Sequence, residues 1–299
     1  LYSFTFSPDE LDDIGLEFEI LVNDGEEQLT SVNNFIYWNN IVDEIPNLNL
    51  QDNWQMFSIP YLLEDDLIDA IFDEMAQFKY GRDWRLMHYN GNSNLDAGSG
   101  ISRIEPGLGY WFYTSENVNI DIGDGSVNTS TPFQLDLRQG WNQIGNPYNV
   151  TLNWNSVLNA NGVSSQVQLP VLYNPDANGY DETTTINPFE GAFVWSDQEV
   201  SVDISLVDNI STARTATFAD SGDDIDAAHW RLELMLEAAE IMKSRAGLGM
   251  SPRAQAGKDS YDRMSLPRLS RFADIKTVHE EYFYPWFRTD ILPTADEAS

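Results

Sequence analysis

The sequence predicts a mainly β, multidomain protein in which a duplicated β-rich module with a short peripheral helix precedes a β-sandwich-like domain. Three observations support this prediction. Four sequence blocks recur in the same order, many short runs alternate apolar with polar side chains, and a polar, acidic segment separates the repeat from a region of different charge balance.

The internal repeat is the strongest of these signals. The Trp, Pro and Tyr of one block keep their spacing, and the later blocks drift by only a few positions. The matching pairs are residues 53–61 with 140–148, 87–90 with 171–174, 104–109 with 186–191, and 118–122 with 200–204. Agreement of four blocks in one order predicts two copies of a single unit, packed about a pseudo-twofold axis so that each covers the apolar face of the other.

We divide the chain at shifts in pattern and composition. The segments are a strand-rich leader or the end of a β-sandwich at 1–50, a first module at 51–126, a second module at 127–210, an acidic linker at 211–227, and a C-terminal β domain, expected to be incomplete, at 228–299.

Hydrophobic periodicity predicts the elements within these segments. Alternation of Val118, Ile120 and Ile122 with polar residues is typical of a half-buried strand, and Trp230 begins a similar pattern. The segment 238–243 is compatible with either a strand or a helix. Apolar side chains at helical spacing predict an amphipathic helix over 67–75, and the second copy is expected to shorten it to 153–159.

The charge of the chain is strongly negative and uneven. The formal net charge is −32, divided as −17 over 1–80, −11 over 81–210 and −4 over 211–299. This field repels phosphate backbones and anionic lipid, so we expect no nucleic-acid partner. No transmembrane segment is expected, because no stretch approaches the roughly 20 apolar residues that a membrane helix needs. Both a solvated acidic coat and a cation-loaded surface are compatible with the charge.

Two blocks and the C-terminal region carry a resemblance to a known class. The blocks at 140–148 and 106–111, followed by motifs at 230–234, 246–249, 256–262 and 266–267, are similar to modules of large extracellular proteins exported by the type IX secretion pathway. The resemblance covers residues 53–292. It implies an extracellular or cell-surface location and a β domain that precedes a sorting domain, and it implies no catalytic residue.

Catalytic signatures are missing from the sequence. It has no cysteine, no nucleophile elbow, no phosphate-binding loop and no dinucleotide fingerprint. The histidines are His88, His229 and His279, and the last lacks the second histidine of a zinc-protease helix. Paired carboxylates could serve glycoside hydrolysis, but 48 acids make chance spacings common. We therefore expect a protein that is not an enzyme.

Calcium is the one cofactor that the sequence suggests. Oxygen-bearing side chains alternate beside a glycine turn, and a second pair lies in the C-terminal domain. The candidate ligands are Asp176, Asn178, Asp181, Glu182, Asp259 and Asp262. The alternative is that these side chains only cap turns and loops.

The aromatic residues allow two interpretations. Tryptophans at matched repeat positions, such as Trp111 and Trp195, are expected in a shared core. Three others, Trp38, Trp84 and Trp154, lack repeat partners and are the candidates for exposed glycan-binding platforms.

These observations favour a non-catalytic, secreted surface protein acting as a structural, adhesive or self-assembling module. The alternative is a glycan-binding ancillary region of a larger secreted enzyme. The expected partners are other surface proteins, further copies of the chain, or polysaccharide.

Overall fold

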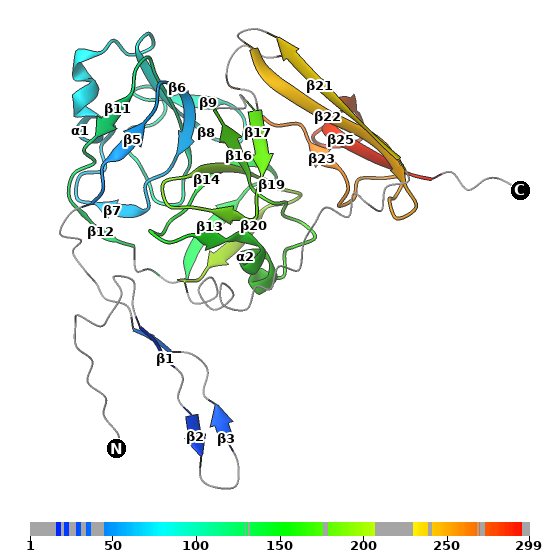
Figure 1. The fold of residues 1–299 in the computed structure, drawn as a ribbon, viewed down its shortest axis with the longest axis horizontal. Helices are drawn as coiled ribbons and strands as arrows, with labels where there is room; N and C mark the ends of the chain where they lie inside the picture. Colours follow the sequence, from blue (N-terminus) through cyan, green and yellow to red (C-terminus); the bar gives the residue numbers. More distant parts are fainter. Residues whose placement is uncertain are drawn as a thin grey trace, which may run out of the picture.

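The computed structural model describes residues 45–128, 130, 132–175, 179–206, 230–238, 241–267, 269 and 273–294, together with four short strands before residue 45. Strands dominate the described residues, so the mainly β fold class is confirmed (Figure 1). The predicted linker at 211–227 lies outside the described residues.

The leader contains two antiparallel pairs of three-residue strands. β1 (Leu16–Phe18) pairs with β4 (Asn34–Ile36), and β2 (Leu21–Asn23) pairs with β3 (Gln28–Thr30). Pairing of successive strands β2 and β3 is the arrangement expected of a hairpin.

The first unit is built on a four-stranded antiparallel sheet. Its order is β6 (Asn53–Phe57), β10 (Tyr110–Thr114), β8 (Trp84–Tyr89) and β9 (Asn94–Asp96). Two ribbons complete it, β5 (Leu48–Leu50) with β11 (Val118–Ile120), and β7 (Tyr61–Leu63) with β12 (Gly125–Val127).

The second unit has a sheet of the same strand order. The order is β14 (Gly140–Gly145), β19 (Gly191–Ser196), β16 (Val171–Asn174) and β17 (Gly179–Glu182). Its ribbons are β13 (Phe133–Leu137) with β20 (Val200–Ile204), and β15 (Leu152–Asn153) with β18 (Thr185–Ile186).

Each unit has its own apolar core, and the alternating strands supply it. Ile120 and Ile122 are buried while Asn119 and Asp121 are exposed, so the prediction of a half-buried strand is confirmed. The first core also includes Phe57, Leu86 and Phe112, and the second core is built in the same way from strands β13, β14, β19 and β20.

The helices differ from the prediction in length. The segment 67–75 forms only α1 (Ile68–Ile71), followed by a 3₁₀ turn at Asp73–Gln77, whereas α2 (Trp154–Asn161) is the longer helix. The expectation that the second copy is shorter was therefore wrong. The physical reason lies in the ends: the side chain of Asn153 accepts a hydrogen bond from the Ser156 amide and Gly162 ends α2 in the left-handed conformation, while α1 has no side-chain cap.

Reciprocal backbone contacts join the two units. The Ser58 amide donates to the Phe189 carbonyl at 2.9 Å, and the Gly145 amide donates to the Gly107 carbonyl, also at 2.9 Å. Isolated bridges pair Phe57 with Glu190 and Leu108 with Ile144. In the alignment of the sequence blocks, Ser58 corresponds to Gly145 and Gly107 to Phe189, so each contact is the counterpart of the other.

Glycine is required where these backbones meet. A Cβ at Gly109 would lie 2.3 Å from the Ile144 carbonyl oxygen, and a Cβ at Gly191 would lie 2.7 Å from the Phe57 carbonyl oxygen. Both distances are shorter than a carbon–oxygen contact allows. Alignment offset by 82 makes these two glycines equivalent, so the same close approach occurs on both sides of the junction.

The C-terminal unit is a separate sheet. Its order is β21 (Trp230–Ala238), β22 (Ile241–Ser251), β25 (Trp286–Pro293) and β23 (Arg263–Met264), and β24 (Thr277–Val278) also pairs with β25. β22 and β25 are parallel, and the other pairs are antiparallel. The ambiguous segment 238–243 contains the end of β21 and the start of β22, which settles its described residues as strand.

A third apolar cluster joins all three units. Its buried members come from the first sheet, the second sheet and the C-terminal unit: Met87, Trp111, Trp141, Val171, Phe193, Trp195, Met264, Leu266 and Phe287. The Trp141 indole nitrogen donates to the Ser265 carbonyl at 2.7 Å, and the Trp195 ring contacts Tyr284 at 5.0 Å between centroids. The C-terminal unit therefore packs on the sheets of both preceding units.

Substitution of Gly109 by alanine tests the close approach at the junction. We expect Gly109→Ala to lower the free energy of unfolding by about 3 kcal/mol, because the methyl group would meet the Ile144 carbonyl. Gly81→Ala is the control, since it has a positive φ of 78° but nothing within 4 Å, and we expect it to cost about 1 kcal/mol. Equal losses in urea unfolding would contradict the steric account.

Candidate functional site

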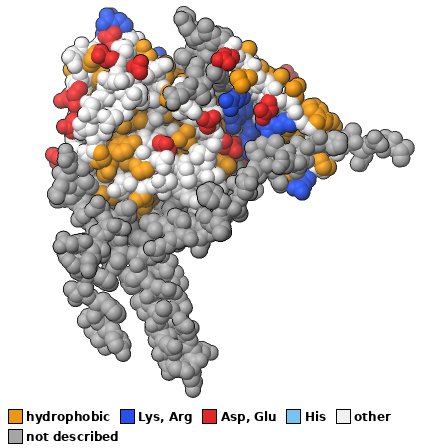
Figure 2. All heavy atoms as spheres, in the orientation of Figure 1, with side chains coloured by type: hydrophobic (Ala, Val, Ile, Leu, Met, Phe, Trp, Pro, Cys, Tyr) orange, Lys and Arg blue, Asp and Glu red, His pale blue; other side chains and the backbone are white. Residues whose placement is uncertain are grey.

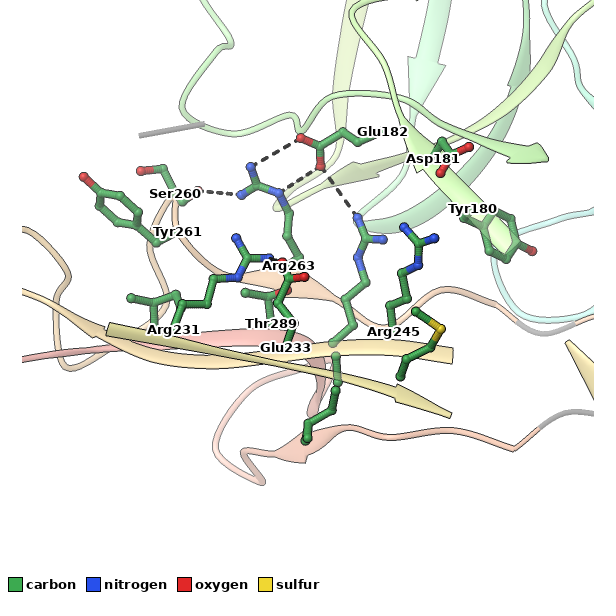
Figure 3. Close-up of a pocket in the computed structure, with 15 residues that line it drawn as sticks. Tyr180, Asp181, Glu182, Arg231, Glu233, Arg245, Ser260, Tyr261, Arg263 and Thr289 are labelled. Carbon is green, nitrogen blue, oxygen red and sulfur yellow. Dashed lines mark hydrogen bonds and ion pairs between the residues drawn. The ribbon is translucent and has the colours of Figure 1, made fainter. Parts of the chain in front are cut away.

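A basic groove of about 800 Å³ lies between the second unit and the C-terminal sheet (Figure 2). Tyr180, Asp181 and Glu182 of β17 form one side. Strands β21, β22 and β25 form the other, and residues 260–263 close one end. Four arginines, one from each of four strands of the C-terminal sheet, line it: Arg231, Arg245, Arg263 and Arg288. Figure 3 labels the first three.

Strand register explains how these side chains reach one groove. Arg231 is paired with Gly249, and Glu233 is paired with Gly247, so these two groove-lining residues of β21 each lie opposite a glycine. A Cβ at Gly247 would lie 3.4 Å from Arg231 Nε. Because Gly247 has no side chain, the guanidinium of Arg231 lies directly over the backbone of β22. Thr289 and Ile291 of β25 are paired with the same glycines from the opposite side.

Glu182 is the carboxylate that connects the two sides of the groove. Arg263 Nε lies 2.9 Å from a Glu182 carboxylate oxygen, and Arg288 lies 3.6 Å from the same oxygen. All three side chains are at least half-buried, so these charges are only partly screened by water. The two ion pairs hold the C-terminal sheet against β17.

Other arginines of the groove are less constrained. Arg231 forms an ion pair of 3.2 Å with Glu233, whose side chain is 76% exposed, and its buried Nε has no hydrogen-bond partner among the described residues. Arg245 is exposed and has neither ion pair nor hydrogen bond within the described part of the chain. With four arginines against Asp181, Glu182 and Glu233, the formal charge of the groove is +1 in a chain of −32.

The first set of calcium candidates is only partly described. Asp176 and Asn178 lie outside the described residues. Asp181 accepts a hydrogen bond of 2.7 Å from the side-chain Nδ2 of Asn174, and Glu182 pairs with the arginines. The arginine pairs on Glu182 oppose a cation at the same carboxylate, and calcium at this first set of residues stays a prediction.

The second set forms a loop held by its own carboxylates. Asp259 accepts hydrogen bonds from the amides of Gln255 and Tyr261, and Asp262 accepts from those of Asp259 and Ile291. Both Asp259 oxygens and both Asp262 oxygens thus accept from backbone donors, which is the loop-capping interpretation of these residues, and calcium at this loop stays a prediction. Burial raises the pKa of Asp262 to about 6, because desolvation outweighs the two amide donors.

No group of three or more acidic or histidine residues is placed to hold a metal ion in the described ranges. Among the same residues, no helix combines the length and hydrophobicity needed to cross a bilayer.

The described tryptophans that the sequence suggested as exposed glycan-binding platforms are covered by other residues. Trp154 is fully buried, and its indole donates to the Gln168 carbonyl at 3.2 Å. Trp84 is half-buried and stacks on Phe72 with ring centroids 6.0 Å apart. Neither ring is open to a sugar face, so both assignments are corrected. Trp38 lies outside the described residues. Trp84 is covered because it packs against the first core, and Trp154 is buried because it is the first residue of α2, which packs on the second core.

The repeat tryptophans occupy the core, as the sequence predicts. Trp111, Trp141 and Trp195 are between 1% and 3% exposed and belong to the cluster that joins the three units. Trp54 is half-buried against the same cluster.

Both described histidines have local structural partners. His88 Nδ1 lies 2.8 Å from the Gly109 carbonyl at the junction, and burial lowers its pKa. His279 Nε2 lies 2.8 Å from Asp290, and this carboxylate raises the histidine's pKa. His229 lies outside the described residues. We find that these imidazoles support the backbone and the C-terminal sheet.

Comparison with known proteins gives no further assignment: no protein-family model, curated protein or solved structure matches this chain.

The sequence reasoning missed the arginine groove. Its signal was present in the charge distribution, because residues 211–299 contain 11 of the 16 basic residues. A second signal was the alternation of glycine at 247 and 249 along a strand, which indicates a surface without side chains that another group can approach.

Loss of the Glu182 charge tests the ion pairs across the groove. We expect Glu182→Gln to lower the free energy of unfolding by about 1–2 kcal/mol, between the values for exposed and fully buried pairs. Arg82→Gln is the control, since its pair with Asp83 is on the surface and screened by water, so its loss should change stability much less than Glu182→Gln does. If the two variants unfold at the same urea concentration, Glu182 does not hold the two sides together.

Ionisation of Asp262 should make stability depend on pH. Its folded pKa of about 6 lies above the usual aspartate value of 3.8, so the folded state binds the proton more tightly and stability falls as pH rises from about 4 to 6. Asp262→Asn cannot ionise. We therefore expect the melting temperature of the variant, relative to the wild-type protein, to rise between pH 4 and pH 7. A difference that stays constant with pH would show that Asp262 does not titrate in this range.

Proposed function

We propose that this chain is a non-catalytic part of a secreted surface protein and acts as a structural, self-associating unit. One observation carries the proposal: the C-terminal sheet exposes apolar side chains on a shared face. Trp230 and Leu232 are 48% and 50% exposed on β21, and Leu292 is 45% exposed on β25. Register pairs Trp230 with Met250 and Met250 with Leu292, so these side chains lie next to one another.

The charge distribution favours a second copy of this chain as the occupant of that face. Residues 211–299 have a net charge of −4, against −17 and −11 for the preceding segments. Two copies therefore meet with the least repulsion through their C-terminal sheets. Exposed apolar patches on a sheet are a common site of association.

A non-catalytic role is supported by what the polar residues do. Carboxylates of the 259–262 loop accept backbone hydrogen bonds, Glu182 pairs with two arginines, and His88 and His279 have structural partners. Secretion and surface location rest on the sequence motifs alone. We also propose that the two modules are copies of one unit, supported by the matching strand orders and reciprocal contacts.

Sedimentation of the wild-type protein tests self-association. We expect a larger mean mass in 1 M than in 0.05 M NaCl, because the Debye length falls to about 3 Å and repulsion between the acidic copies is screened. Leu232→Glu should raise the dissociation constant of the assembly at high salt at least tenfold, since it places a charge within the apolar face.

The matched control is Leu62→Glu, which adds the same charge at a leucine of similar exposure on β7. It should associate like the wild-type protein. A wild-type protein that stays monomeric at every salt concentration, or a Leu232→Glu variant that associates normally, would contradict the proposal. Electron microscopy of the same samples would show whether the assemblies are ordered.

A further inference from the structure

We propose that the arginine groove binds an anionic carbohydrate, with its carboxylate or sulfate groups on the arginines and one sugar ring on Tyr261. The inference concerns a different surface from the exposed C-terminal face, and it goes beyond the structural role without depending on it.

The arginines supply the anion-binding part of the groove. In Figure 3, the labelled guanidinium groups of Arg231, Arg263 and Arg245 are directed into the space between the C-terminal sheet and β17. Arg245 has no ion pair among the described residues, and the Glu233 side chain that pairs with Arg231 is 76% exposed. Forming contacts to a ligand at these two residues breaks no buried interaction. A planar guanidinium also matches a carboxylate or sulfate with two parallel hydrogen bonds.

The acidic residues indicate that the ligand is not a simple anion. Glu233 and Asp181 line the same groove, and both are exposed. Carboxylates repel phosphate or sulfate but accept hydrogen bonds from hydroxyl groups. A ligand that carries acid groups and neutral hydroxyls on one framework satisfies both kinds of side chain. Acidic sugars have this combination, and nucleic acid has a continuous line of phosphates that the surrounding negative surface disfavours.

Tyr261 and the size of the groove favour a sugar ring. The Tyr261 side chain is half-buried at one end of the groove and has no ring contact with another aromatic residue in the described part of the chain. Its ring face can therefore pack against the apolar face of a sugar. The volume of about 800 Å³ falls within the range of small-molecule sites. Ser260 and Thr289 add hydroxyl groups to the lining.

Titration of the purified chain with defined oligosaccharides tests this inference. Calorimetry would use a hexamer of galacturonic acid, a hexasaccharide of chondroitin sulfate and neutral cellohexaose. The buffer contains 0.15 M NaCl because this salt concentration screens acidic charges of the protein that lie more than about 8 Å from the ligand. We expect one or both acidic oligosaccharides to bind and cellohexaose not to bind. Comparison of the two acidic arms distinguishes a carboxylated from a sulfated ligand.

Variants locate the binding to the groove. Arg245→Gln should weaken binding at least tenfold and Arg245→Lys by a smaller factor, because lysine keeps the charge but loses the paired donors. Tyr261→Ala should weaken the oligosaccharide several-fold and leave any binding of inorganic sulfate unchanged. Arg82→Gln, which removes one exposed positive charge elsewhere, should bind like the wild-type protein. Unchanged melting temperatures would show that the variants fold.

Three outcomes would overturn the inference. The first is absence of heat or saturation with either acidic oligosaccharide up to millimolar concentration. The second is binding that Arg245→Gln and Tyr261→Ala leave unchanged, which would place the ligand elsewhere. The third is that a polyaspartate peptide binds as tightly as the acidic sugars and that Tyr261→Ala weakens the binding of neither. This result would make the groove a general anion site.

Discussion

The pair of reciprocal backbone contacts between the two modules is the constraint on which the rest of the structure depends. Amides of Ser58 and Gly145 each donate across the junction, and Gly109 and Gly191 allow the two backbones to approach. These contacts fix the two sheets relative to each other. Side chains from both sheets then form one aromatic surface, with Trp111 from the first and Phe193 from the second. The position of the C-terminal unit follows from that surface.

The two reciprocal contacts differ in the residue whose carbonyl accepts the hydrogen bond, glycine at 107 and phenylalanine at 189. Gly107 and Phe189 occupy equivalent positions, and both have positive φ, 79° and 66°. A Cβ at Gly107 would lie 2.6 Å from the Phe133 ring, so only glycine fits there. At the other position the Phe189 ring packs against Tyr61 and the first core, 5.8 Å between centroids. Burial of that ring offsets the cost of a non-glycine residue with positive φ, about 1 kcal/mol.

The arginine groove is a consequence of docking. β17 is the outer strand of the second sheet, and the docked C-terminal sheet faces it, so charges from distant parts of the sequence meet. Glu182 is paired with Arg263, 81 positions later in the chain. In a chain of net charge −32, bases concentrated in the last third can neutralise carboxylates at this contact and still leave Arg245 without an ion pair among the described residues. The same arrangement therefore contributes to both stability and the proposed binding of an acidic sugar.

Local patterns were sufficient to predict the fold class, but the site depended on contacts between distant segments. Alternation around Ile120 gave the strand and its buried face because period two is a property of the local chain. Helix length at 67–75 was mistaken, since the spacing of apolar residues carries no information on the missing cap. Trp84 and Trp154 were assigned to the surface because they lacked repeat partners, yet each is covered by residues of its own unit. Burial depends on tertiary contacts that local patterns do not contain. The groove could not be predicted for the same reason, because its lining residues Glu182 and Ser260 lie 78 positions apart in the sequence.

The most direct test of the junction is native-state hydrogen exchange at the amides of Ser58 and Gly145. Both donate to carbonyls of the opposite module, so their exchange reports on separation of the two modules. We expect both amides to exchange slowly and with the same free energy of opening, equal to that of amides in the central strands β10 and β19. Fast exchange at either amide, or unequal opening free energies at the two, would show that the modules separate without unfolding and would contradict the account.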